Sequence, residues 1–184
     1  SGDRSDFGSD ARPSRRRSPG TGQRPLIEEN GATSWQTPRF RRERRDGKDI
    51  WRVVRPSAAE METREAFSTP VFTNDPSGKR VMLISGGDCL TAHDPATGKE
   101  LWRWGNWNPD RNKNLRLVPS PVAGAGVAVV CAPKNRPAFG VKMSGSGNLS
   151  DSDLAWTSNP KQVTSDVSTP VFYEGKFYVL DSNH

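Results

Sequence analysis

The stretch Ser68-Thr69-Pro70-Val71-Phe72 decides how this chain is built, because it recurs unchanged as residues 168–172. A shorter copy, Pro-Ser-Pro-Val at 119–122, lies midway, and the central prolines of the three copies are 51 and then 49 residues apart. A period of this size is typical of repeat architectures in which each repeat is one supersecondary unit. We therefore expect several copies of one structural unit along the chain.

A second series of residues runs in phase with the first. Asp-Gly-Lys-Asp-Ile-Trp at 46–51 is echoed by Thr-Gly-Lys-Glu-Leu-Trp at 97–102, and Asp-Ser-Asp-Leu-Ala-Trp at 151–156 is a looser copy. The tryptophans that end these copies are 51 and 54 residues apart. Two independent markers with one period make the repeat a strong signal.

The content of each repeat predicts β-structure, because short apolar runs alternate with turn residues such as Asp94-Pro95-Ala96-Thr97-Gly98. The expected strands are residues 69–73, 80–85, 89–93 and 99–104 in one copy, and 121–123, 126–132, 138–143 and 154–157 in the next. Each run is too short for a helix of average length. Four short strands per repeat with a recurrent aromatic residue are the pattern of a β-propeller blade.

Residues 92–102, Ala-His-Asp-Pro-Ala-Thr-Gly-Lys-Glu-Leu-Trp, resemble the tryptophan-docking motif of PQQ-like (quinoprotein dehydrogenase-like) propeller repeats. The resemblance covers roughly residues 46–184; it is specific at Trp102, partial at Trp51 and degenerate at Trp156. It implies structural docking roles, in which one large flat side chain fills the wedge between blades. The residues to which it gives this role are Ala92, Asp94, Thr97, Gly98, Trp102, Trp51 and Trp156.

The expected fold is therefore all-β, a partial PQQ-like β-propeller of about three four-stranded blades. We expect residues 46–184 to form it, with an outer strand near Trp51, blades at 68–107 and 118–158, and the start of another at 168–184. Propellers usually close with 4–8 blades. The expectation is a fragment of a longer chain, completed by missing blades; an open stack and completion by another chain are the alternatives.

The positive charge of the chain is concentrated at its N-terminal end. The 184 residues carry a net charge of +6, but residues 56–184 hold equal numbers of acidic and basic side chains. Residues 1–45 are rich in Arg, Ser, Gly and Pro without apolar periodicity, which predicts a disordered Arg-rich segment. Such an arm could bind nucleic acid through counterion release, but we favour a solvated tail because no stacking aromatic residues interleave the arginines.

No catalytic, cofactor-binding or metal-binding residues can be assigned from the sequence. The family that the motif resembles includes the quinoprotein dehydrogenases, which hold PQQ and calcium. A pair of adjacent cysteines is among the marks of these enzymes. Here Cys89 and Cys131 are 42 residues apart, and we expect both to be small buried residues. His93 lies inside the docking motif, His184 ends the chain, and no Gly-x-Ser-x-Gly motif occurs.

The sequence supports a binding face better than a catalytic site. Two long links, at 56–67 and 105–117, should lie at the same end of the propeller as the turns at 86–88 and 133–137. The expected ligand is a polar or sugar-like molecule or a peptide, and the alternative is that Trp107 only packs its loop onto the blade. The candidate residues are Trp107, Asn108, Asp110, Arg111, Lys134 and Arg136.

The preferred function is a non-catalytic propeller scaffold that binds a protein or a small polar ligand in an exported bacterial protein. The periplasmic or extracellular location is implied by the resemblance alone, since PQQ-like propellers are mostly periplasmic or secreted. The segment itself contains no signal peptide and no apolar run that could span a membrane. One alternative is part of a quinoprotein-type oxidoreductase whose PQQ and calcium ligands lie in missing blades. The other is nucleic-acid binding through the basic arm.

Overall fold

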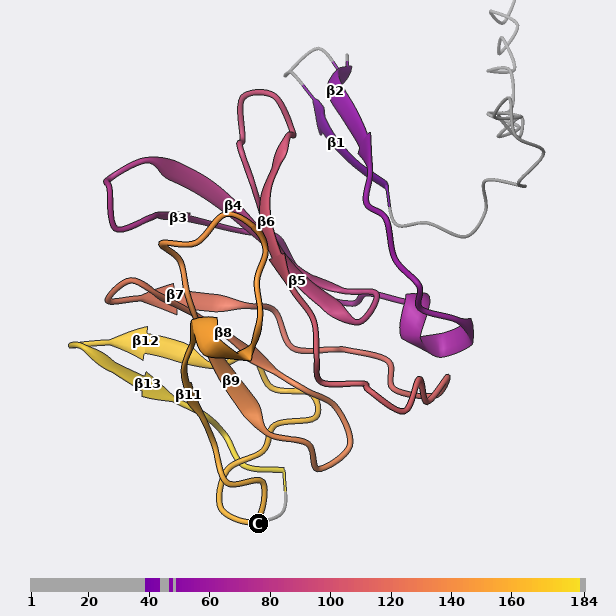
Figure 1. Ribbon diagram of the computed structural model, residues 1–184, viewed down its shortest axis with the longest axis vertical. Coiled ribbons are helices and arrows are strands. Elements are labelled where there is room, and N and C mark those ends of the chain that lie inside the picture. The colour runs from indigo at the N-terminus through magenta and orange to yellow at the C-terminus, as the bar shows by residue number, and fades with distance from the viewer. Residues whose placement is uncertain (1–38, 44–46, 48, 183–184) are drawn as a thin grey trace, which may run out of the picture. The chain divides into compact units, whose positions relative to one another are not determined.

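The computed structural model describes residues 39–43, 47 and 49–182, and this part of the chain is all-β. It contains a five-stranded sheet, a four-stranded sheet and two hairpins, and none of these sheets closes on itself (Figure 1). The only helices among the described residues are two short 3-10 turns, Met61–Arg64 and Asp151–Asp153. No helix in this part of the chain is long and apolar enough to cross a membrane.

The first sheet is an antiparallel meander built from consecutive segments of the chain. Its strands are β3 (Val71–Asn74), β4 (Arg80–Gly86), β5 (Cys89–His93) and β6 (Glu100–Trp104). They pair in sequence order, with Leu83 opposite Ala92 and Ala92 opposite Trp102. The two central strands are buried on both faces, which explains why they read as continuous apolar runs and not as an alternation.

The second sheet repeats this meander about fifty residues later. It contains β7 (Val122–Gly124), β8 (Val127–Cys131), β9 (Ala138–Lys142) and β11 (Leu154–Thr157). The register slips between Leu154 and Trp156, where β11 pairs with β9. The prediction of four strands in each of two consecutive repeats is confirmed to within about two residues at the strand ends.

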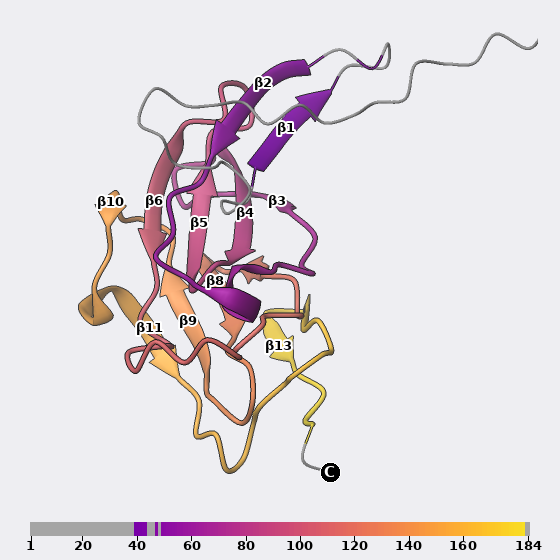
Figure 2. The same cartoon turned by 90° about the vertical axis from the view of Figure 1, so that its right-hand side faces the viewer.

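Strand β10 (Gly147–Asn148) was not predicted. It lies in the connection between β9 and β11 of the second sheet, yet it pairs in parallel with β6 of the first sheet (Figure 2). The Leu149 N–H extends this pairing by donating to the Arg103 carbonyl at 2.8 Å. The connection therefore covers the outer edge of the preceding sheet, where backbone groups would otherwise be unpaired.

Two hairpins flank the sheets along the sequence. Strands β12 (Val171–Tyr173) and β13 (Lys176–Tyr178) follow the second sheet, and β1 (Arg39–Glu43) pairs with β2 (Asp49–Val54) ahead of the first. Strand β1 falls inside the segment 1–45 for which the sequence predicts disorder, and its pairing with β2 supplies the backbone hydrogen bonds that such a segment lacks. The rest of that segment, including the basic cluster at 15–17, lies outside the described residues, as does His184.

The first strands of successive repeats are linked by the hydroxyl side chains of the repeated Ser/Thr-Pro motif. The Thr69 N–H donates to Ser120 Oγ at 2.7 Å, and the Ser120 N–H donates to Thr169 Oγ1 at 3.0 Å. One repeat further along, the Phe172 ring of β12 lies directly against Gly124 of β7, where a Cβ atom would be only 2.3 Å from the ring. Strands β3, β7 and β12 therefore follow one another as neighbours (Figure 1).

The main hydrophobic core spans the first and second sheets. Leu83 and Leu90 of the first sheet belong to one cluster with Val130 and Val141 of the second. The Trp104 ring lies 5.8 Å from that of Trp107 and 4.9 Å from that of Phe139, measured between ring centroids. These aromatic side chains fill the space where β6 and its following link meet the next sheet, each burying a large apolar area.

Candidate functional site

A polar cleft of about 460 Å³ lies where three connecting segments meet. The segments are the chain after β2, the turn between β4 and β5, and the link between β6 and β7. Backbone conformations that favour glycine shape the turn, since φ is +130° at Gly86, +59° at Gly87 and +60° at Asp88. The lining side chains that carry polar groups are Ser57, Asp88, Cys89, Arg103, Asn106, Asn108 and Arg111.

Two of the six predicted face residues, Asn108 and Arg111, line this cleft. The Asn108 side chain organises the link, because its Nδ2 donates to Asp88 Oδ2 at 2.9 Å and to the Asn112 carbonyl at 3.0 Å. Its Oδ1 accepts the Asn112 N–H at 2.9 Å. Arg111 is exposed and has φ of +50°. Asn108 therefore positions the wall of the cleft, and Arg111 is an exposed cation in its lining.

The other predicted face residues do not line the cleft. The Trp107 side chain is only 2% exposed and packs in the core against Trp104, which fits the alternative in which it holds the loop on the sheet. Arg136 donates to the Trp107 carbonyl at 2.5 Å and lies 3.7 Å from the Asp110 carboxylate, so it joins the links 105–117 and 133–137. Lys134 is exposed, and its backbone N–H donates to the Asp166 carboxylate.

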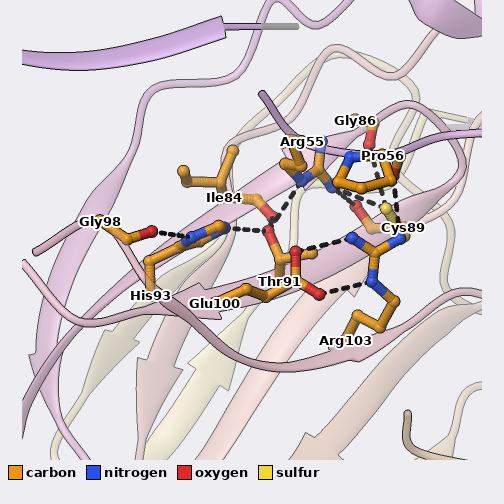
Figure 3. Close-up of polar contacts among 10 residues, drawn as sticks. All are labelled: Arg55, Pro56, Ile84, Gly86, Cys89, Thr91, His93, Gly98, Glu100 and Arg103. Carbon is orange, nitrogen blue, oxygen red and sulfur yellow. Dashed lines mark hydrogen bonds and ion pairs between the residues drawn. The ribbon is translucent and has the colours of Figure 1, made fainter. Parts of the chain in front are cut away.

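Behind the cleft lies a buried polar cluster that the sequence did not reveal (Figure 3). Arg55, directly after β2, is completely buried. Its Nε donates to Thr91 Oγ1 at 2.8 Å, and its Nη2 donates to the Cys89 carbonyl and, at 2.9 Å, to Cys89 Sγ. Its Nη1 is also buried and has no hydrogen-bond partner. Burial lowers the pKa of Arg55 from its ordinary value.

The hydrogen bonds of the cluster continue from Thr91 to His93. His93 Nδ1 lies 2.9 Å from the Gly98 carbonyl, which can only accept, so Nδ1 carries the proton. Nε2 then accepts from the Thr91 hydroxyl at 3.0 Å. The histidine is 2% exposed, and burial lowers its pKa against the opposing effect of the bond to Gly98. This arrangement fits a neutral, structural histidine within the first sheet.

A second arginine at the cleft is held by an ion pair. Arg103 on β6 donates to both carboxylate oxygens of Glu100, at 2.5 and 2.6 Å, and to the Pro56 carbonyl at 2.8 Å (Figure 3). The bond with Glu100 raises the pKa of Arg103. A bidentate pair of this kind fixes the guanidinium plane as well as its charge.

The cysteines have the buried positions predicted for them, and both are free. Burial raises the pKa of Cys89, and it raises that of Cys131 to about 12. Both are therefore thiols at neutral pH, not nucleophilic thiolates. The described residues also contain no group of three or more His, Cys, Asp or Glu side chains that could hold a metal ion.

The residues of the predicted docking motif meet around the turn between β5 and β6. Trp51 Nε1 donates to the Pro95 carbonyl at 3.1 Å, and the Trp51 ring covers Gly98, whose φ is +76°. Asp94 Oδ1 accepts the Ala96 N–H at 2.8 Å, and Thr97 Oγ1 accepts the Lys99 N–H at 3.2 Å. These bonds hold the turn in the shape onto which the tryptophan packs.

The remaining docking residues also have positions within or between sheets. Ala92 is fully buried, and its partner across the ladder, Trp102, is 2% exposed. Trp156 lies over Gly140 of its own sheet and 6.1 Å from the Phe177 ring, measured between centroids, but 36% of it is exposed.

No family model matches the chain, and no curated protein matches it significantly.

Proposed function

We propose that this chain is part of a non-catalytic β-propeller of the PQQ-like type, and that it binds a protein or a small polar ligand at the cleft beside Asn108 and Arg111. The exported bacterial setting belongs to the same proposal, since it comes with the family resemblance. The observation that carries the binding function is the cleft itself, of about 460 Å³ and lined mainly by polar side chains.

Two features support the propeller part of the proposal. The hydroxyl groups of the repeated motif connect Thr69 to Ser120 and Ser120 to Thr169, in both cases by accepting a backbone N–H of the preceding copy. The Trp51 ring packs on the Gly98 turn of the following sheet, as expected of a docking tryptophan. Successive four-stranded meanders joined by equivalent contacts are what propeller blades require.

The cleft itself follows from this arrangement, because connecting segments of successive repeats meet at one end of the sheets. Its walls are held by bonds between segments, such as Ser57 Oγ to the Gly87 carbonyl at 2.6 Å and Asn108 to Asp88. A rigid scaffold that positions polar loops is a common basis for recognition.

The binding function is tested by filling the cleft. Ala58 lines it and is exposed, so Ala58→Trp should occupy the space without disturbing the core. Ala155, exposed on β11 and away from the cleft lining, gives the control Ala155→Trp. Saturation-transfer NMR with a panel of sugars, amino acids and short peptides should detect a ligand for the unmodified chain and for Ala155→Trp, but not for Ala58→Trp. A panel without ligands would contradict the binding of a small polar ligand, and ligands retained by Ala58→Trp would contradict the cleft as the binding site.

A further inference from the structure

The hairpin β1–β2 pairs in the same way as the last two strands of the first meander. There, β5 and β6 pair with Ala92 opposite Trp102, and a bulge follows directly after Ala92. In the hairpin, β1 and β2 pair with Arg42 opposite Trp51, and a bulge follows directly after Arg42. Trp51 and Trp102 are also the equivalent tryptophans of the repeated motif. The hairpin β1–β2 therefore corresponds to the third and fourth strands of a four-stranded sheet.

The hairpin β12–β13 corresponds to the first and second strands of such a sheet. Phe172 lies opposite Phe177 in this hairpin, as Phe72 of β3 lies opposite Met82 of β4. The repeated Ser-Thr-Pro-Val-Phe motif leads into β12 as it leads into β3. Among the described residues, neither hairpin pairs with a further strand. The chain thus contains the two halves of one sheet, and each half has an edge without a partner strand.

An apolar pocket lies beside β2, where the first two strands of a preceding sheet would pack. Leu83 belongs to the core shared with the second sheet, so Met82 beside it in β4 points to the opposite face of the first sheet. Phe72, opposite Met82 in the ladder, shares that face, and 52% of it is exposed. The pocket has a volume of about 660 Å³. Its apolar lining residues are Trp51, Phe72, Met82, Pro95 and Ala96.

The next repeat shows what such a face packs against. Phe172, the equivalent of Phe72, lies against Gly124 of the preceding sheet. In the hairpin β12–β13 the position of Gly124 is taken by Tyr173, which is exposed, as is Tyr178. The two ends of the described array therefore expose the two halves of one kind of interface. The pocket beside Phe72 provides the space that the larger ring of Tyr173 needs.

We infer that the hairpin β12–β13 of a second copy of this chain packs into the pocket, and that its β13 pairs with β1. One four-stranded sheet is then built from two chains, in the order β12–β13–β1–β2. This inference rests on the propeller part of the proposed function and names its partner. Tyr173 and Tyr178 lie against Phe72 and Trp51, and aromatic side chains of this kind are enriched in protein–protein interfaces. The contact continues the packing that β3, β7 and β12 already show.

Two copies satisfy the interface at both ends. Each chain contains two complete four-stranded meanders and the two hairpins. If one chain paired its own hairpins, the ring would hold only three sheets, fewer than the 4–8 blades of closed propellers. Two chains that exchange their hairpins close a ring of six, which lies inside that range. The interface is head-to-tail, and its closure leaves neither copy with an open end.

The first measurement is the mass of the full chain in solution. Sedimentation equilibrium over a series of concentrations should give twice the mass of one chain. Tyr173→Lys brings a positive charge toward Lys79 and Arg80, which line the pocket of the second copy. It should raise the dissociation constant at least about tenfold. Ala155→Lys, an exposed change on β11 outside the pocket lining, should leave the dissociation constant unchanged.

The second measurement traps the pairing of β13 with β1. In the register of the first sheet, where Leu83 lies opposite Ala92, Tyr178 of one copy lies opposite Arg42 of the other. The Cα atoms of such a pair are close enough for a disulfide. Chains with Arg42→Cys and isotope-labelled chains with Tyr178→Cys, mixed under mild oxidation, should form a mixed disulfide that mass spectrometry recognises. A mixture of Ala155→Cys with Tyr178→Cys should not form one.

A chain that is monomeric at every concentration, an assembly that grows beyond two copies, or equal cross-linking in both mixtures would overturn the inference. Association that Tyr173→Lys leaves unchanged would overturn it as well. The contact between Phe172 and Gly124, followed by nuclear Overhauser effects in the same samples, separates this failure from that of the proposed propeller. Monomers that keep the contact overturn only the pairing of two copies, whereas loss of the contact contradicts both.

Discussion

At the scale of single residues, the glycine of the docking motif shows why the motif needs its particular sequence. Gly98 has φ of +76°, and a Cβ atom there would lie 2.6–2.8 Å from atoms of Trp51 and Val53. Glycine is therefore required at residue 98 for two reasons: its backbone has a positive φ, and the Trp51 ring occupies the space that a side chain would need. Gly78 also has a positive φ, of +87°, but open space around it.

Comparing the two glycines separates the effect of backbone strain from the effect of the contact with Trp51. Gly98→Ala should lower the free energy of unfolding by more than Gly78→Ala does, because only the first displaces Trp51. We expect about 1–3 kcal/mol for the backbone strain that both share, and a further loss at residue 98. Urea denaturation of both variants measures the difference. Equal losses would show that Trp51 does not pack on the turn.

His93 gives the stability of the first sheet a defined pH dependence. Its pKa in the folded chain is lowered by burial, so the unfolded chain binds the proton more readily. The contribution of His93 to stability is therefore present above its ordinary pKa of about 6.5 and lost as the pH falls below that value. Asp88 has the opposite effect at lower pH. Because burial raises its pKa, the folded chain binds the proton more readily and becomes more stable relative to the unfolded chain as the pH falls.

We predict that the urea concentration at the midpoint of unfolding decreases when the pH is lowered from 7.5 to 5.5. This decrease should be smaller in His93→Gln than in the unmodified chain. Glutamine keeps a polar group near Thr91 but does not titrate. The difference between the two pH profiles isolates the histidine from the carboxylates. Parallel profiles would mean that His93 is not buried in its neutral form.

At the scale of elements, the connection between β9 and β11 accounts for the degenerate third copy of the tryptophan motif. The residues that form a tight turn at 94–98 are replaced here by a longer excursion that includes β10 and reaches the first sheet. Asp151 accepts from Trp104 Nε1 at 3.2 Å and from Asn106 Nδ2 at 2.8 Å. The excursion thus ties the second sheet to β6 and to the link that follows it.

Asp151→Ala should therefore destabilise the chain, by about 1–3 kcal/mol, because it leaves the buried Trp104 indole without its acceptor. Ser146→Ala, an exposed change in the same connection, should have little effect. Thermal unfolding monitored by tryptophan fluorescence compares the two. A stable Asp151→Ala variant would mean that the connection merely lies over the sheet.

Much of the strand arrangement could be predicted from the sequence, since alternating runs, turn residues and a fifty-residue period are local signals. Strand β10 could not, because Gly147-Asn148 has no apolar pattern and its partner lies in another repeat. At the cleft, Asn108 and Arg111 were predicted from their loop. Arg55 could not be predicted, because the sequence does not show which arginine will be buried when the strands pack. The sequence left two positions open for Trp107, because its polar neighbours suit a binding face and do not show that the ring packs against Trp104.

At the scale of the described part of the molecule, a propeller requires that successive sheets pack on one another in the same way. The residues of β7 that face the next repeat include Gly124, on which Phe172 lies. The same register positions of the following hairpin, Val171 and Tyr173, are 57% and 61% exposed. These positions are therefore open, whereas β7 contacts both β3 and β12.

The most direct test of this account is the contact between Phe172 and Gly124, measured in solution. Nuclear Overhauser spectra of the isotope-labelled chain should show cross-peaks between the Phe172 ring protons and the Gly124 α protons, which the ring current should also shift. Phe172 ring protons without cross-peaks to Gly124, or with cross-peaks only to their own hairpin, would contradict the sequential packing of the sheets and the cleft that follows from it.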